Sequence, residues 1–180
     1  MQQGHDPRIR IVRGDITEET VDAIVNAANE RLEPGGGVDG ALNRAAGPQL
    51  ADAMRAQGGC PPGEARTTPA YGLPAQHVIH AVGPVWRGGD RDEEITLARC
   101  YRNIFAAATK VGARTIAIPA IATGAYGFPV RRAAHVALHE THVALDNGAK
   151  LDEVRFVCFD EDTAHAYESE LQAELETPEV

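Results

Sequence analysis

Short segments rich in valine and isoleucine alternate with helix-like patterns along most of the chain, and this alternation restricts the possible folds more than any other feature. The sequence predicts strands over 8–13, 23–28, 77–82, 115–122 and 153–159, with a fainter sixth over 66–71. Helical periodicity predicts helices over 38–57, 93–111, 129–146 and 162–175. Strands that alternate with helices predict an α/β domain, with a largely parallel sheet and helices on both faces.

Length, charge and cysteine content narrow the class of protein. A chain of 180 residues is expected to form one domain with a substantial core. No apolar run reaches the roughly 20 residues of a membrane helix, and the start MQQGHDPRIR lacks the apolar part of a secretory signal. Cys60, Cys100 and Cys158 form no CxxC pair, so reduced thiols and a cytoplasmic location are expected. A net charge of −9 argues against broad binding to nucleic acid or to anionic membranes.

Two glycine-rich segments follow expected strands, at the edge where open α/β sheets bind ligands. One is Gly35–Gly36–Gly37–Val38–Asp39, shortly after Asn29, and the other is TGAYGF over 123–128. Each leads into an expected helix, whose first N–H groups and dipole favour an anion. Neither contains the lysine of a P-loop, so a diphosphate held by backbone groups is the interpretation. The alternative is that these glycines only mark loops.

The spacing of Gly35, Gly37 and Gly40 also matches the GxGxxG fingerprint of dinucleotide-binding folds. In those folds the strand runs directly into the glycines, whereas residues 29–34 intervene here. A nicotinamide-dependent oxidoreductase is therefore disfavoured.

Four side chains near these loops are candidates for ligand contact. Asn29 can donate to and accept from ribose hydroxyls, and Asp39 at a helix N-terminus can accept from a hydroxyl or orient a water. The structural alternatives are a turn residue for Asn29 and a helix cap for Asp39. Phe159 could stack on a base or belong to the core, and Tyr126 between glycines is expected to meet a ligand or a neighbouring loop.

Several histidines call for a separate interpretation. Four possible metal ligands share one face of the helix expected over 129–146: His135, His139, His142 and Asp146. This face lies opposite small and aliphatic residues, so we interpret it as a solvated face. His80 lies in an apolar strand and is interpreted as a core histidine with its hydrogen bonds satisfied.

Six motifs in order resemble those of the macrodomain family, in particular its MacroD-like class. They are GDIT at 14–17, VNAAN at 25–29, GGGVDGALNRAAG at 35–47, HAVGPVW at 80–86, PAIATGAYGFP at 119–129 and FVCFD at 156–160. The resemblance covers about residues 8–172. It implies that residues 1–180 form a single macrodomain, a three-layer α/β/α fold around a mixed, largely parallel sheet of about six strands.

The resemblance also implies a function and a site. It implies binding of ADP-ribose and hydrolysis of esters on its distal ribose, in O-acetyl-ADP-ribose or in ADP-ribose linked to protein Asp or Glu side chains, without cofactor or metal. By motif, Asp15 and Ile16 would contact adenine, and Phe159 would stack on it. The diphosphate would lie against Ala122, Thr123, Gly124, Ala125 and Tyr126. The distal ribose would lie against Asn29, Gly36, Gly37, Val38 and Asp39, with Asn29, Asp39 and Tyr126 as the catalytic residues.

Two departures from the family pattern and two other functions stay open. Relatives usually have serine where this chain has Ala122, and often glycine where it has Pro34. The first alternative function is a non-catalytic reader of ADP-ribose with the same pocket. The second is a regulatory partner of an RNA-processing enzyme, for which the acidic chain offers no basic patch. A monomer is expected.

Overall fold

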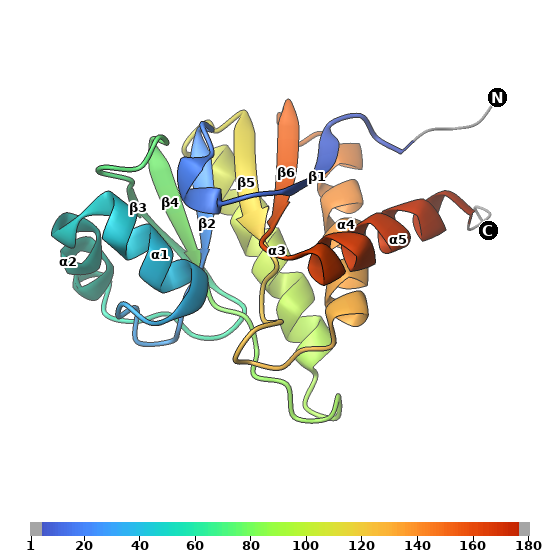
Figure 1. Ribbon diagram of the computed structural model, residues 1–180, viewed down its shortest axis with the longest axis horizontal. Helices are drawn as coiled ribbons and strands as arrows, with labels where there is room; N and C mark the ends of the chain where they lie inside the picture. The colour runs from blue at the N-terminus through green and yellow to red at the C-terminus, as the bar shows by residue number, and fades with distance from the viewer. Residues whose placement is uncertain (1–4, 177–180) are drawn as a thin grey trace.

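The computed structural model describes residues 5–176, which contain one continuous six-stranded sheet (Figure 1). The strands are β1 (Ile9–Arg13), β2 (Ala23–Ala27), β3 (Ala65–Pro69), β4 (His77–Ala81), β5 (Thr115–Pro119) and β6 (Glu153–Cys158). They lie in the order β1-β6-β5-β2-β4-β3. All neighbouring pairs are parallel except β3 and β4, which are antiparallel. The predicted mixed, largely parallel sheet is confirmed.

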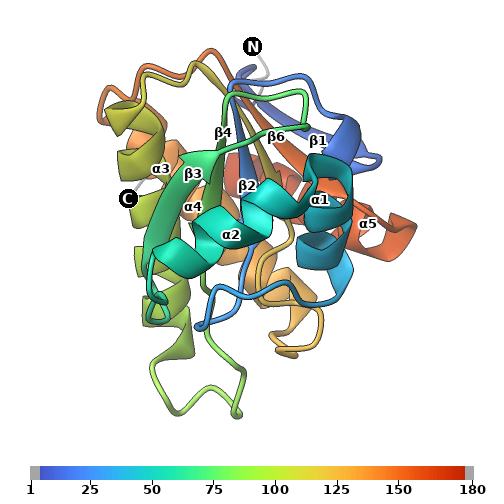
Figure 2. The ribbon, with the colours of Figure 1, turned by 90° about the vertical axis from the view of Figure 1, so that its left-hand side faces the viewer.

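Helices cover both faces of this sheet, which gives three layers (Figures 1 and 2). The helices are the 3₁₀ turn η1 (Ile16–Glu18), α1 (Gly37–Ala46), α2 (Pro48–Ala56), α3 (Glu93–Lys110), α4 (Val130–Asp146) and α5 (Glu161–Glu176). Side chains alternate along β2: Ala23 and Val25 pack with α3, α4 and α5, while Ile24 packs with α1 and α2. No helix within residues 5–176 is long and apolar enough to span a lipid bilayer.

The single helix predicted over 38–57 is wrong, because the structure has two helices there. Helix α1 ends at Ala46, and α2 begins at Pro48. Gly47 between them has φ 91° and ψ 172°, far from helical values. Proline has no backbone N–H and disfavours a helical residue before it, so the pair Gly47–Pro48 separates the helices and turns the chain.

Other element boundaries differ by a few residues. The fainter strand predicted over 66–71 is β3, which begins one residue earlier and ends at Pro69. The strand predicted over 115–122 ends at Pro119, because the next residues leave the sheet. Ala122 has φ 67°, a left-handed conformation that no β-strand contains. The loop that contains the second glycine-rich segment therefore begins directly after Pro119, earlier than the sequence indicated.

The interpretation of the α4 histidines as one solvated face is wrong for His142. His135 and His139 are exposed, but the His142 side chain is only 26% exposed and forms an ion pair with Glu174 of α5. No group of three or more His, Cys, Asp or Glu side chains within residues 5–176 is arranged to hold a metal ion. His142 therefore links two helices.

This ion pair should make stability depend on pH. The hydrogen bond and charge of Glu174, helped by the charge of Asp146, raise the pKa of His142. The hydrogen bond from Arg8 lowers the pKa of Asp6, and the charge of His142 adds a smaller part. A raised folded-state pKa stabilises the fold fully below the unfolded value of about 6.5, and this contribution is lost as the pH rises through the folded value. We expect His142→Gln to reduce the free energy of unfolding more at about pH 5.5 than at about pH 9, measured by urea denaturation. An equal reduction at both pH values would contradict this, and exposed His139→Gln is the control.

Candidate functional site

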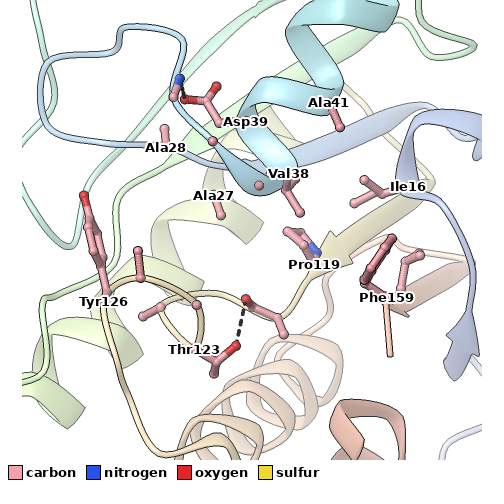
Figure 3. Close-up of a pocket in the computed structure, with 18 of the residues that line it drawn as sticks. Ile16, Ala27, Ala28, Val38, Asp39, Ala41, Pro119, Thr123, Tyr126 and Phe159 are labelled. Carbon is pink, nitrogen blue, oxygen red and sulfur yellow. Dashed lines mark hydrogen bonds between the residues drawn. The ribbon is translucent and has the colours of Figure 1, made fainter. Parts of the chain in front are cut away.

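A cavity of about 860 Å³ opens at the carboxyl ends of the parallel strands. In Figure 1 the loops that follow β2, β4 and β5 gather at this end of the sheet. In Figure 3, Phe159 and Ile16 lie on one side of the cavity, and Tyr126 lies on the opposite side. We call the end with Phe159 the aromatic end of the cavity, and Tyr126 lies at the opposite end.

Every residue that the sequence analysis assigned to ligand contact lines this cavity. They are Asp15, Ile16, Asn29, Gly36, Gly37, Val38, Asp39, Ala122, Thr123, Gly124, Ala125, Tyr126 and Phe159. They come from segments far apart in the sequence, which the parallel sheet brings to one edge. Their individual roles remain predictions.

Free backbone N–H groups line the middle of the cavity. Helix α1 begins after Gly36 without a side-chain cap. Among the described residues, the N–H groups of Gly37, Val38 and Asp39 have no hydrogen-bond partner, and neither do those of residues 123–126. Two sets of unpaired donors, one at a helix N-terminus, form the cradle that an anion such as a diphosphate requires.

Asp39 is the most buried acid at the cavity, with 3% of its surface exposed. Its Oδ1 accepts from the amides of Asn26 and Asn43, both at 2.9 Å, and its Oδ2 accepts from the Gly35 N–H at 3.0 Å. Figure 3 shows this carboxylate turned toward the neighbouring loop. A carboxylate has about four acceptor positions, so one position remains, on Oδ2.

The environment of Asp39 makes its carboxylate more basic than an ordinary one. Burial raises the pKa of Asp39, and the hydrogen bonds from Asn26, Gly35 and Asn43 oppose part of that rise. A carboxylate with a raised pKa accepts a proton more readily, which suits a general base.

The structure shows Asn29 in the turn role weighed for it, and part of its amide stays available for a ligand. Its amide donates to the Glu33 carbonyl at 2.8 Å and accepts from the Glu33 N–H at 3.3 Å, so it is a turn residue. One amide N–H is left over. A methyl group placed on Gly35 would lie 3.4 Å from Asp39 Oδ2 and 3.5 Å from Asn29 Nδ2, so both groups border the same glycine. The two groups that stay available for a ligand, one on Asn29 and one on Asp39, therefore both lie next to Gly35.

At the aromatic end, Asp15 and Phe159 have different surroundings. Asp15 caps η1, with its Oδ1 accepting from the Thr17 N–H at 2.9 Å and from the Thr17 hydroxyl at 2.6 Å. These bonds lower the pKa of Asp15 and leave Oδ2 free. Phe159 is 85% exposed, so the interpretation of this residue as part of the core is wrong.

Tyr126 lies half-buried at the far end of the cavity. Burial raises the pKa of its hydroxyl, and the charges of Glu30 and Asp39 add to the rise. The phenol therefore stays protonated at neutral pH and can donate a hydrogen bond. The backbone carbonyl of Tyr126 accepts a hydrogen bond from the Trp86 N–H at 2.8 Å, which fixes this loop to the segment after β4.

The cavity has further lining residues that the sequence analysis did not assign. They are Gly14, Ala27, Ala28, Gly35, Ala41, Arg44, Gly83, Pro119, Ala120, Val157, Asp160 and Thr163. Most lie at strand ends or in the residues just after them, which the rule for open sheets could have included. Ala41 lies three residues after the assigned Val38, and Arg44 three residues after Ala41, so helical spacing from Val38 could have indicated both.

Comparison with known proteins identifies the fold and its relatives. A family model described as Macro domain matches residues 25–137. The chain belongs to the macro domain family. This confirms the resemblance that the six motifs indicated.

The relatives of this macrodomain carry informative names. It is 51% identical over 166 residues to an O-acetyl-ADP-ribose deacetylase of Enterobacter cloacae, a match that covers 90% of this chain and 92% of the relative. An Oceanobacillus iheyensis macrodomain solved with ADP has a TM-score of 0.88 at 39% identity, covering 92% of this chain and 90% of that one. A Trypanosoma brucei macrodomain solved with ADP-ribose has a TM-score of 0.84 at 44% identity, covering 90% and 68%.

In this macrodomain Ala122 still helps to hold the loop over residues 122–128 in place. Its carbonyl accepts from the Phe128 N–H at 2.9 Å, and the Gly124 carbonyl accepts from the Gly127 N–H at 3.0 Å. The loop geometry therefore depends on backbone hydrogen bonds and not on a hydroxyl at position 122.

Proposed function

We propose that this macrodomain binds ADP-ribose and hydrolyses esters on its distal ribose. Its substrates would be O-acetyl-ADP-ribose and ADP-ribose linked to protein Asp or Glu side chains. The observation that carries the proposal is the buried Asp39 carboxylate, which has one acceptor position open and borders the same glycine, Gly35, as the Asn29 amide. The names of the relatives support the same class of reaction.

Each part of ADP-ribose has a matching part of the cavity. The diphosphate would accept from the free N–H groups at Gly37–Asp39 and at residues 123–126. The distal ribose would then lie near Asn29 and Asp39, and adenine near Asp15 and Phe159. The cavity volume of about 860 Å³ is large enough for a ligand of this size.

Hydrolysis would proceed by attack of a water on the ester carbonyl carbon. Asp39 Oδ2 would orient this water and accept its proton, helped by the raised pKa of the carboxyl. The bond between the carbonyl carbon and the ribose oxygen then breaks, and the ribose oxygen receives a proton. The products are ADP-ribose and the free carboxylic acid. Tyr126 would cover the sugar, and positioning would supply most of the rate enhancement.

Phe159 gives a direct test of the adenine end. Because its ring is 85% exposed, Phe159→Ala should leave thermal stability unchanged. Loss of stacking, worth about 1–3 kcal/mol, should weaken ADP-ribose binding roughly 10- to 100-fold by calorimetry. Phe159→Tyr keeps an aromatic face and should bind as the wild type does. Equal affinities for Phe159→Ala and the wild type would place adenine elsewhere.

The deciding experiment measures product release from both ester classes. Purified protein is incubated with O-acetyl-ADP-ribose and, separately, with a protein mono-ADP-ribosylated on Glu or Asp, and free ADP-ribose is quantified. Release in either case, abolished in Asp39→Ala, supports the hydrolase, and the ratio of the two rates identifies the preferred substrate. A protein that binds ADP-ribose but releases none from either ester would be a reader instead.

A further inference from the structure

The Asp39 carboxylate is connected to side chains that lie outside the cavity. Asn26 donates to Asp39 Oδ1 at 2.9 Å, and the same Asn26 nitrogen lies 3.0 Å from His80 Nδ1. His80 Nε2 lies 2.9 Å from the Thr68 hydroxyl. Asn26 and His80 are entirely buried, and Thr68 is 2% exposed. None of the three lines the cavity.

The sheet itself brings these three residues together. Asn26 of β2 is the register partner of His80 on the parallel strand β4. Thr68 lies on the antiparallel edge strand β3, close to the residue opposite His80. The connection therefore crosses three neighbouring strands and reaches Asp39 at the start of α1. Such an arrangement does not depend on flexible loops.

The hydrogen bonds can run in only one direction. An ionised carboxylate only accepts, so Asn26 must present its NH₂ group to Asp39, and this orientation leaves Asn26 Oδ1 without a partner among the described residues. The second hydrogen of that NH₂ points to His80 Nδ1, which must be an unprotonated acceptor. A neutral His80 then carries its proton on Nε2 and donates to Thr68. The Thr68 hydroxyl in turn donates to the Pro69 carbonyl at 3.0 Å.

Burial favours the neutral ring that this chain of donors needs. It lowers the pKa of His80 to about 4. Asn26 can therefore rely on Nδ1 as an acceptor at neutral pH.

We propose that His80 and Thr68 are positioning residues, which hold Asn26 and through it the Asp39 carboxylate in the orientation that hydrolysis uses. This rests on the hydrolase function proposed above. Asp39 Oδ1 is fixed by the amides of Asn26 and Asn43, so the open position on Oδ2 keeps one direction. Without the His80 acceptor, the Asn26 amide can rotate to relieve its unpartnered oxygen, and Asp39 loses one of its three donors.

The pair Thr68→Val and Thr68→Ser tests this without touching the cavity. Valine keeps the shape of threonine but leaves His80 Nε2–H without an acceptor, whereas serine keeps the hydroxyl. We expect Thr68→Val to lower kcat for O-acetyl-ADP-ribose about 10-fold, with Kd for ADP-ribose changed by less than about 2-fold. Thr68→Ser should restore kcat to near the wild-type value. Wild-type kcat in Thr68→Val, or parallel losses in both variants, would overturn the inference.

Nuclear magnetic resonance of the histidine ring nitrogens gives a readout that is independent of turnover. In the wild type, His80 should carry its proton on Nε2 at neutral pH, with its signal assigned by its disappearance in His80→Asn. A proton on Nδ1, or a charged ring, would overturn the inference. A wild type inactive on both esters would refute the proposed hydrolase, while the tautomer and its change in Thr68→Val would still decide whether this chain of hydrogen bonds exists.

Discussion

Asp39→Asn is expected to lower turnover of O-acetyl-ADP-ribose by about 100-fold or more, with ADP-ribose affinity changed much less. Asparagine has nearly the same size, but its NH₂ group cannot accept a proton. With its oxygen facing Asn26 and Asn43, its NH₂ would face the Gly35 N–H, so the open acceptor position is lost. Steady-state kinetics and calorimetry on the same preparation separate the two effects. Unchanged turnover would remove Asp39 from the mechanism.

The pH profile sharpens this test. Because the pKa of Asp39 is raised, kcat/KM of the wild type should begin to fall at a higher pH than an ordinary aspartate would give as the solution is acidified. Asp39→Asn should lose this acid limb. Asp52→Asn, on the exposed surface of α2, is the matched control and should keep both the rate and the limb.

Gly40→Ala is expected to abolish most ADP-ribose binding, because the added methyl group would clash with the backbone of the loop before α1. A Cβ at position 40 would lie 2.6 Å from the Gly35 carbonyl oxygen and 3.1 Å from a guanidinium nitrogen of Arg44. The flexible Arg44 side chain can move away. The Gly35 carbonyl belongs to the backbone, so it can move only if the loop before α1 moves with it. The loop would shift away from α1 and displace the N–H that binds Asp39 Oδ2. We expect affinity to fall about 10- to 100-fold, as a strain of roughly 1–3 kcal/mol implies.

Calorimetry measures that affinity, and thermal unfolding measures the accompanying loss of stability. Gly36→Ala is the control for stability, because a Cβ there meets nothing within 4 Å and its φ of −89° suits any residue. It should unfold near the wild-type temperature. Gly40→Ala with wild-type affinity and stability would mean that the loop tolerates displacement and that its close contact with α1 is unimportant.

The sequence was sufficient to predict the architecture because hydrophobic periodicity reports which face of each element is buried. The six strands, the parallel character of the sheet and both glycine-rich loops follow from that pattern and from the positions of glycine and proline. The break between α1 and α2 was also readable, since Gly47–Pro48 is a strong signal for the end of a helix. Overlooking that pair, and not a lack of information, produced the wrong single helix.

Sequence reasoning could also identify residues that line the cavity, but it could not predict how side chains are exposed or which partners they contact. Motifs placed Asn29 and Phe159 just after strands and Asp39 at a helix N-terminus, and all three line the cavity. The exposure of Phe159 and the ion pair of His142 with α5 depend on elements that approach only in the folded chain. Neither can be read from a window of neighbouring residues.

By itself the sequence determined the α/β fold and its family, because periodicity, glycine placement and six ordered motifs are properties of the chain. Only the tertiary structure decided what surrounds Asp39. The three donors to its carboxylate come from β2, from the loop before α1 and from α1 itself, and Asn26 is oriented by His80 on another strand. Hydrogen bonds depend on distance and angle between groups that are far apart in the sequence. The one acceptor position left open on Asp39 therefore exists only once the sheet has formed.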